Sequence, residues 1–396
     1  VPMPTDHPPY SAKNIKGEDV EVTTDPADKP VLWIFKTKAD PFLGRISYAK
    51  VITGTVKAGQ ELYNARSQKM EKLGSMFYVR GKSQVPATEV VAGDIFALAK
   101  LAGTRTGDTL SPKSEGISFE PIDFPKPNYF IAVQAKDKND EEKMAQGLFK
   151  LMEEDPSFEL VRNPETHQSL LGGQGDLQIG IIKEKLKKNY GIDVVTVPQK
   201  IAYRETIKGT SDVQGKHKKQ SGGAGQYGDV HIRFSPSSEP GLEFSEELFG
   251  GSVPKNYVPA VEKGLLECME KGPLAGCKCV NVKAVLYDGS YHDVDSNEVS
   301  FKLAAGLAFR KGIAEANPCL LEPIMHMEIY VPDEYMGDVM GDMNKRRGKI
   351  LGMEPQQSGE QKLLAEAPQA ELFDYALGLR SMTQGRGTFE MKFERY

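Results

Sequence analysis

Two short stretches in the third quarter of the chain hold the residue types that contact phosphate and ribose. The first is Gly215-Lys-His-Lys-Lys-Gln-Ser-Gly-Gly-Ala-Gly-Gln-Tyr-Gly228, and the second is Tyr287-Asp-Gly-Ser-Tyr-His-Asp-Val-Asp-Ser296. Glycines let a backbone approach a phosphate closely, and lysines attract phosphates without reading sequence. Glutamine and histidine side chains can bond to ribose or phosphate, and an exposed histidine can also stack on a base. The residue types of the two stretches suit RNA contact, although their spacing alone does not establish it.

The candidate RNA-binding residues are the lysines, the small residues and the polar or aromatic side chains of these stretches. They are Lys216, Lys218, Lys219, Ser221, Gly222, Gly223, Gly225, Gln226, Tyr227, Tyr291, His292 and Asp293. Spacing alone leaves a second interpretation open, in which a solvated hairpin carries lysines for solubility. Weaker candidates for RNA contact are Arg346, Arg347, Arg380 and Arg386. The first two of these fall at a helix end, where cations also complement the helix dipole, so a structural role is equally open.

The histidine of the second stretch also suggests a metal or acid–base site together with Asp293 and Asp295. No second histidine lies within ligand spacing of His292, and zinc sites normally draw on several His or Cys residues. Asp295 and Glu298 have the spacing of a capping box ahead of a helix, which gives them a local role. We therefore expect no metal site and no catalytic residue in this chain.

A phosphate-binding loop is not recognisable in the sequence. Gly81-Lys-Ser83 ends like such a loop, but the first glycine of the motif would fall at position 76, which is Met76. Phosphoryl transfer needs that loop to hold the phosphates. We therefore expect no enzymatic activity and no bound cofactor for this stretch of protein.

Length and composition limit the class of protein. The chain has 396 residues, which at roughly 150 residues per domain indicates two to four domains. Fifty Lys and Arg against 55 Asp and Glu give a net charge of −5, which argues against a uniformly basic nucleic-acid binder but allows local basic patches. No stretch reaches the ~20 apolar residues of a membrane helix. Four cysteines are few for this length and favour a reducing, cytoplasmic location.

The N-terminal third of the chain is rich in β-formers. Between residues 31 and 118, short apolar runs follow Ala-Gly-polar turns and no helical period competes with them, which predicts an antiparallel β-barrel. Residues 1–30 are rich in Pro, Asp, Lys and Thr without periodicity, so we expect an extended linker there.

Two later segments, 119–198 and 321–396, repeat one order of elements. Each reads strand, helix, strand, strand, helix, strand, which is the split βαββαβ order of a ferredoxin-like sandwich. In the first segment, the helix expected from about residue 176 to 189 carries Leu177, Ile181 and Leu186 on one apolar stripe. Residues 199–320 lie between the two segments and hold both candidate RNA-contact stretches. The expected fold class is multidomain, combining all-β and α+β parts.

At these stretches the chain resembles bacterial elongation factor G, the GTPase that drives translocation on the ribosome. The run at 287–296 is similar to the tip loop of the family's fourth domain, and Ser221–Gly228 is similar to the glycine-rich loop beside it. Asp40-Pro-Phe-Leu-Gly-Arg45 resembles the start of the second domain. Gly378-Leu-Arg-Ser-Met-Thr-Gln-Gly-Arg386 resembles the end of the fifth. The resemblance runs from about residue 2 to 396 and covers nearly the whole chain.

The resemblance implies domains II to V of that family, with a tRNA-mimicking, ribosomal-protein-S5-like domain IV between the two ferredoxin-like domains. It also implies that the N-terminal GTPase domain is missing, in keeping with Val rather than Met at position 1, and that GTP and Mg²⁺ belong to the parent protein. The partners expected from the family are the ribosome, ribosomal RNA, the A-site tRNA–mRNA duplex and the missing GTPase domain. No membrane contact is expected, and the protein is expected to be a monomer.

Two departures from the family pattern keep alternative functions open. Ala224 stands where the family usually has Arg, and Gly172-Gly-Gln-Gly-Asp-Leu-Gln178 follows the family's third-domain loop only loosely. The chain is therefore expected to belong to the main translocase or to a divergent paralogue that acts in ribosome recycling or ribosome protection. A free-standing RNA-binding module without a GTPase domain is the remaining alternative.

Overall fold

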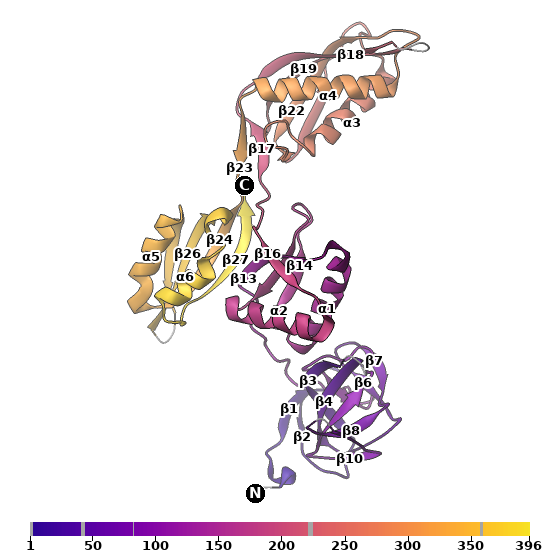
Figure 1. Cartoon of the computed structure of the whole chain (residues 1–396), viewed down its shortest axis with the longest axis vertical. Coiled ribbons are helices and arrows are strands. Elements are labelled where there is room, and N and C mark those ends of the chain that lie inside the picture. The colour runs from indigo at the N-terminus through magenta and orange to yellow at the C-terminus, as the bar shows by residue number, and fades with distance from the viewer. Residues whose placement is uncertain (1–2, 41–43, 82, 221–224, 357–358) are drawn as a thin grey trace. The chain divides into compact units, whose positions relative to one another are not determined.

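The computed structural model describes residues 3–40, 44–81, 83–220, 225–356 and 359–396. These residues form two compact units, Val1–Gln199 and Lys200–Tyr396, and each unit holds sheets and hydrophobic cores of its own (Figure 1). None of the helices in the described ranges is long and apolar enough to cross a membrane.

An antiparallel sheet of eight strands forms the first part of unit 1. Its strands follow the order β7-β6-β12-β3-β4-β11-β8-β9 and wrap around a core that includes Leu32, Val51 and Phe96. The predicted β-barrel is therefore present (Figure 1). Strands β5 and β10 form a separate antiparallel pair. The strands are β3 Val31–Asp40, β4 Gly44–Thr53, β5 Thr55–Lys57, β6 Glu61–Asn64, β7 Lys69–Lys72, β8 Met76–Arg80, β9 Ser83–Pro86, β10 Glu89–Val91, β11 Ile95–Ala99 and β12 Thr109–Ser111.

Residues 3–30 do not form the extended linker that the sequence predicted for residues 1–30. A short 3-10 helix, Pro4–Asp6, precedes an antiparallel pair of strands, β1 Tyr10–Lys13 and β2 Asp19–Val22. The pair buries Ala12 and Val22 in a small cluster with residues of the barrel. Each strand has only four residues, too few for alternation to stand out in the sequence, so the prediction was wrong.

The second part of unit 1 has the predicted βαββαβ order. Its four-stranded sheet runs β14-β15-β13-β16, and helix α2 ends at Gly191, whose φ of 70° is left-handed. The predicted apolar stripe of α2 is wrong in part, because Ile179, Ile182 and Leu186 face the core whereas Leu177 is 76% exposed. The elements are β13 Tyr129–Ala135, α1 Glu141–Glu154, β14 Glu159–Arg162, β15 Ser169–Gly173, α2 Asp176–Tyr190 and β16 Val194–Val197.

Unit 2 begins with a four-stranded sheet in the order β18-β19-β22-β20, in which β20 runs parallel to β22. Helices α3 and α4 cover one face of this sheet, and Phe234, Phe301 and Phe309 lie in the core between them (Figure 1). A small sheet, β21-β17-β23, adjoins it. The elements are β17 Arg204–Ile207, β18 Ser211–Lys219, β19 Gln226–Pro236, β20 Leu242–Glu246, α3 Val258–Met269, β21 Lys278–Cys279, β22 Val282–Ser290, α4 Glu298–Glu315 and β23 Pro318–Leu321.

One buried carboxylate organises the small sheet. Glu205 on β17 is fully buried and accepts hydrogen bonds from the backbone N–H groups of Leu274, Ala275 and Cys277, at 2.8 to 2.9 Å. Burial, reinforced by the negative charge of Glu205, raises the pKa of the Cys279 thiol to about 12. All four cysteines of the chain are free thiols.

The last part of unit 2 repeats the βαββαβ order. Its sheet runs β25-β26-β24-β27, and helices α5 and α6 pack against one face (Figure 1). The elements are β24 Ile324–Pro332, α5 Met336–Lys345, β25 Lys349–Pro355, β26 Glu360–Pro368, α6 Tyr375–Met382 and β27 Thr388–Arg395.

Candidate nucleic-acid interface

The β18–β19 hairpin presents the predicted lysines to solvent. Lys218 pairs directly with Tyr227 across the hairpin, and Lys216 pairs with Asp229, so these side chains lie on one face of the two strands. The Lys216 ammonium group lies 5.5 Å from the centre of the Tyr227 ring, within the range of a cation–π contact. Lys216, Lys218 and Lys219 are all exposed.

The loop that follows β22 is joined to this hairpin through Asp295. The Gly225 N–H donates to Asp295 Oδ1 at 2.9 Å, and the Tyr227 N–H donates to the Asp295 carbonyl oxygen at 2.9 Å. The Ser296 hydroxyl donates to the Tyr227 carbonyl oxygen, also at 2.9 Å. The two sequence stretches, about 70 residues apart, are thus held together as one surface.

His292 lies exposed at the end of this surface. Its backbone N–H donates to Ser296 Oγ at 2.9 Å, and its Nδ1 lies 3.5 Å from Asp295 Oδ2. The side chain of His292 is 57% exposed, and its ring centre is 6.5 Å from that of Tyr227. Tyr291 and Asp293 beside it are exposed as well. The fixed backbone leaves the imidazole accessible to a ligand.

The predicted helix cap in this loop is wrong. Asn297, and not Asp295, caps α4, since its Oδ1 accepts from the Ser300 N–H at 2.9 Å and from the Ser300 hydroxyl at 3.0 Å. The Asp295 carboxylate instead binds Gly225 of the hairpin. Within the described ranges, no group of three or more His, Cys, Asp or Glu side chains is placed to hold a metal ion.

A network of polar side chains around the buried Asp229 joins the hairpin to β22, and the sequence analysis singled out only Tyr227 among its members. The hydroxyls of Tyr227 and Ser290 lie 2.8 Å apart, and Ser290 donates to Asp229 Oδ2 at 2.8 Å. Gln214 Nε2 donates to the other Asp229 oxygen at 2.8 Å. The alternation of β18 and β19 could have placed Gln214 and Asp229 on one face, but their pairing depends on a strand register that the sequence leaves open.

Two of the glycines have a packing role that the sequence analysis did not predict, and RNA contact by the glycines stays a prediction. A Cβ at position 228 would lie 2.5 Å from the Ser300 carbonyl oxygen, and one at position 225 would lie 2.8 Å from Asp295 Cγ. Gly225 and Gly228 are therefore needed for close packing inside the protein. Gln226 is also engaged, with its Oε1 2.9 Å from His217 Nε2. The remaining candidates Ser221, Gly222 and Gly223, with Ala224, lie outside the described residues.

The arginine candidates near the C-terminus make contacts within unit 2. Arg346 binds Asp342 at 2.7 Å and Asp374 at 2.6 Å, and Arg347 binds both oxygens of Glu322 at 2.7 and 2.9 Å. The Arg347 guanidinium lowers the pKa of Glu322 by hydrogen bonding.

Two further arginines were candidates. Arg386 bonds to Glu334 and lies over the ring of Tyr335, and Arg380 is half-buried on α6. For Arg346, Arg347 and Arg386 these contacts account for the side chain structurally, and RNA contact by all four stays a prediction.

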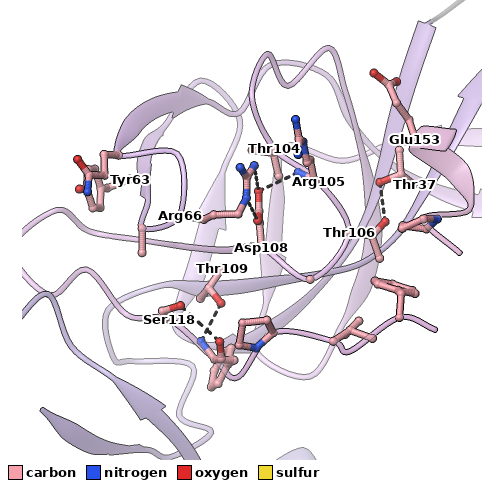
Figure 2. A pocket seen from close by; sticks show the side chains of 18 of the residues that line it. Thr37, Tyr63, Arg66, Thr104, Arg105, Thr106, Asp108, Thr109, Ser118 and Glu153 are labelled. Carbon is pink, nitrogen blue, oxygen red and sulfur yellow. Dashed lines mark hydrogen bonds and ion pairs between the residues drawn. The ribbon is translucent and has the colours of Figure 1, made fainter. Parts of the chain in front are cut away.

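Unit 1 contains a hollow of about 950 Å³ that the sequence analysis did not anticipate (Figure 2). Loop 104–109 of the barrel lies on one side of it, and α1 contributes Phe149 and Met152. Asp108 accepts from Asn64 and Arg66 at its polar wall, while the Thr37 and Thr106 hydroxyls lie 2.9 Å apart. These polar groups bind one another, so the hollow carries a satisfied structural network.

A β-barrel, two split βαββαβ units and a sheet domain with a lysine-rich tip between them define a multidomain class of translation factor. Models of four successive parts of elongation factor G match the chain: domain 2 at residues 31–113, domain III at 124–198, domain IV at 198–317 and the C-terminus at 319–396. The chain therefore belongs to the elongation factor G family.

A solved structure agrees with this assignment. The crystal structure of a protein from Thermus thermophilus shares 40% sequence identity with the chain, with a TM-score of 0.76. The match covers 93% of this chain and 55% of the Thermus protein. The chain thus spans about half the length of that relative.

Proposed function

We propose that this chain is the ribosome-binding part of an elongation-factor-G-like protein that promotes GTP-dependent translocation of tRNA and mRNA during protein synthesis. The four matched segments act as domains II to V, with domain boundaries at 31–118, 119–198, 199–320 and 321–396. GTP and Mg²⁺ bind to a separate GTPase domain of the parent protein. The tip formed by the β18–β19 hairpin and loop 291–296 contacts ribosomal RNA and the A-site tRNA–mRNA duplex in the cytoplasm.

The observation that carries this proposal is the joining of hairpin and loop through Asp295. It gathers three exposed lysines and an exposed histidine at one end of a sheet. Lysines bind phosphates regardless of sequence, which suits a factor that must act on every codon. The histidine can bond to ribose or stack on a base.

The proposed mechanism assigns no chemical step to this chain. Nucleotide binding and hydrolysis in the GTPase domain bias rearrangements of domains II to V on the ribosome. Domain IV then follows the A-site tRNA towards the P site and blocks its return. The direct test measures translocation by the full-length parent on ribosomes with tRNA in both sites. Multiple-turnover translocation supports the proposal, and ribosome binding with no movement of tRNA or mRNA contradicts it.

A second function, as a paralogue in ribosome recycling or protection, is favoured by one residue. Ala224 replaces the Arg usual in the family at this loop, which removes a cation from the predicted RNA contact. If the parent is a paralogue, it should translocate poorly and Ala224→Arg should raise the rate. Normal translocation that does not respond to Ala224→Arg would remove the case for the paralogue.

A further inference from the structure

Phe249 is the most exposed large apolar side chain in the described part of the protein. It is 91% exposed and lies in the loop that follows β20. Its apolar neighbours in the loop point inward: Leu248 packs against the core of unit 2, and Val253 is 1% exposed. The ring therefore stands alone above a well-packed loop and does not belong to a wider apolar patch.

The backbone of the loop holds the ring outward. Gly250 and Gly251 have φ angles of 63° and 74°, which lie in the left-handed region, and the Ser252 N–H donates to the Phe249 carbonyl oxygen at 3.4 Å. Residues other than glycine rarely adopt such φ values. Because Leu248 and Val253 anchor the loop on either side, the turn between them sets the backbone position from which the Phe249 side chain extends into solvent.

Sheet topology places Phe249 at the same end of the sheet as the proposed RNA-binding tip. Strand β20 runs parallel to β22, and the Glu247 N–H continues the pairing by donating to the Leu286 carbonyl oxygen at 2.8 Å. A Cβ at Gly289 would lie 2.5 Å from Val253 Cγ2, so the loop reaches the level of Gly289. Loop 291–296 begins just beyond that level.

The end of the sheet thus carries a row of groups in strand order. Lysines lie on β18, Tyr227 on β19, Tyr291 and His292 after β22, and Phe249 after β20. Neighbouring strands are about 4.8 Å apart, so the row spans roughly 14 Å from β18 to β20. A row with cations at one end and aromatic rings along the rest combines the two kinds of group by which proteins bind unpaired nucleotides.

We propose that Phe249 stacks on an unpaired RNA base beside the tip, and so extends the RNA interface across the whole end of the sheet. This inference rests on the proposed function. The chemistry of the loop favours a base over a phosphate, because the exposed carboxylate of Glu246 repels phosphate and a phenyl ring offers only its face. An isolated ring with inward-turned neighbours also gives a protein partner little apolar area to cover.

The test places the photo-crosslinker p-benzoylphenylalanine at position 249 of the full-length parent, bound to ribosomes that carry mRNA and two tRNAs. Position 291 serves as the reporter of the tip. Position 266 is the control, because Leu266 is exposed on α3 of the same domain. We expect crosslinks to RNA from positions 249 and 291 and none from position 266.

The outcomes separate this inference from the proposed function. Crosslinks to RNA from 291 but not from 249 would overturn the role of Phe249 and leave the tip intact. Loss of RNA crosslinks from both positions would overturn both proposals, and crosslinks from 249 to protein alone would overturn stacking on a base.

Substitutions then test the chemistry of the contact. We expect Phe249→Leu to lower affinity for the ribosome several-fold, because leucine has no aromatic ring to stack on a base. Phe249→Tyr should leave the affinity unchanged, because tyrosine keeps that ring. Equal affinity of the Leu and Phe proteins would rule out stacking.

Discussion

Asp295 joins the two segments of the candidate RNA-binding surface through hydrogen bonds. Its carboxylate and its carbonyl oxygen each accept a hydrogen bond from the β18–β19 hairpin, from Gly225 and Tyr227 respectively. His292, three residues earlier, is held within reach of the same hairpin. The orientation of the exposed side chains therefore depends on a residue that is itself half-buried.

Removing the Asp295 carboxylate should loosen the hairpin locally. We expect Asp295→Ala to speed hydrogen exchange at the Gly225 amide, because that N–H loses its acceptor, while Asp295→Asn restores protection. A buried or half-buried hydrogen bond contributes about 0.5–1.5 kcal/mol, so exchange should rise by roughly twofold to thirteenfold. Asp293→Ala is the matched control, since Asp293 is exposed in the same loop. Equal exchange in all variants would show that Asp295 does not hold the hairpin.

The Cys279 thiol gives a second test at a single residue. Its pKa is raised to about 12 by burial and by the charge of Glu205, so almost no thiolate exists at pH 8. We expect Cys279 to resist iodoacetamide at pH 8 in the folded chain and to react readily in urea, as peptide mass spectrometry would show. Rapid labelling of Cys279 in the folded protein would contradict its buried position.

At the scale of elements, close packing of α4 on the β18–β19 hairpin explains two glycines at the ends of the first candidate RNA-contact stretch. Gly215 and Gly228 lie where a Cβ would meet the backbone oxygens of Ala304 and Ser300, at 2.2 and 2.5 Å. The glycine-rich composition was visible in the sequence. The reason for Gly215 and Gly228 was not visible there, because it depends on helix α4, which begins about 70 residues later.

A glycine substitution distinguishes packing from phosphate contact. We expect Gly228→Ala to destabilise unit 2, since overpacking costs about 1–3 kcal/mol. Gly337→Ala on α5 is the control, because a Cβ there meets nothing within 4 Å and alanine is favoured over glycine in a helix. Urea unfolding followed by circular dichroism measures both. A Gly228→Ala protein as stable as the wild type would indicate that the close contact with α4 is absent.

The sheet of the last βαββαβ part should be sensitive to acid. Hydrogen bonds from Lys362 and Arg395 lower the pKa values of Glu328 and Glu366 respectively. A carboxylate with a lowered folded pKa stabilises the fold above its unfolded pKa, and this contribution is lost as pH falls through the folded pKa. We therefore expect the melting temperature to decrease as the pH is lowered below about 4.5, the range in which Glu protonates in the unfolded chain.

The comparison that checks this is the difference between two variants. Glu366→Gln should flatten the acid dependence of the melting temperature, whereas Glu390→Gln, on the exposed side of β27, serves as the control. If the melting temperature depends on pH in the same way in both variants and the wild type, the Glu366–Arg395 pair does not cause the acid sensitivity.

For the whole molecule, the order of elements was largely accessible from the sequence. Strand runs, turn glycines and helical periods indicated the barrel and both βαββαβ parts, because each pattern is local. The predictions were wrong where contacts between distant segments determine the structure. The β1–β2 pair at the N-terminus is stabilised by Val31, Ile52 and Ile117 of the barrel, and the outward face of α2 carries Leu177 although its periodicity suggested burial.

The candidate site was accessible only in part. Residue types identified the exposed lysines and His292, whereas the support from Asp229, Ser290 and Asp295 required the strand register and the fold of the loop. The net charge of −5 is an average over regions of different charge. Basic groups gather at the tip while ion pairs neutralise most arginines of the last part of unit 2, so a local RNA-binding surface is compatible with an acidic chain.

The central claim is that the tip acts in movement on the ribosome and not in nucleotide hydrolysis. The most direct measurement compares single-turnover translocation and GTP hydrolysis by the full-length parent with and without His292→Ala. We expect translocation to slow by about tenfold, since stacking on a base contributes about 1–3 kcal/mol and 1.36 kcal/mol is tenfold in rate, while GTP hydrolysis stays within twofold. Equal loss of both rates, or no loss of either, would contradict this account.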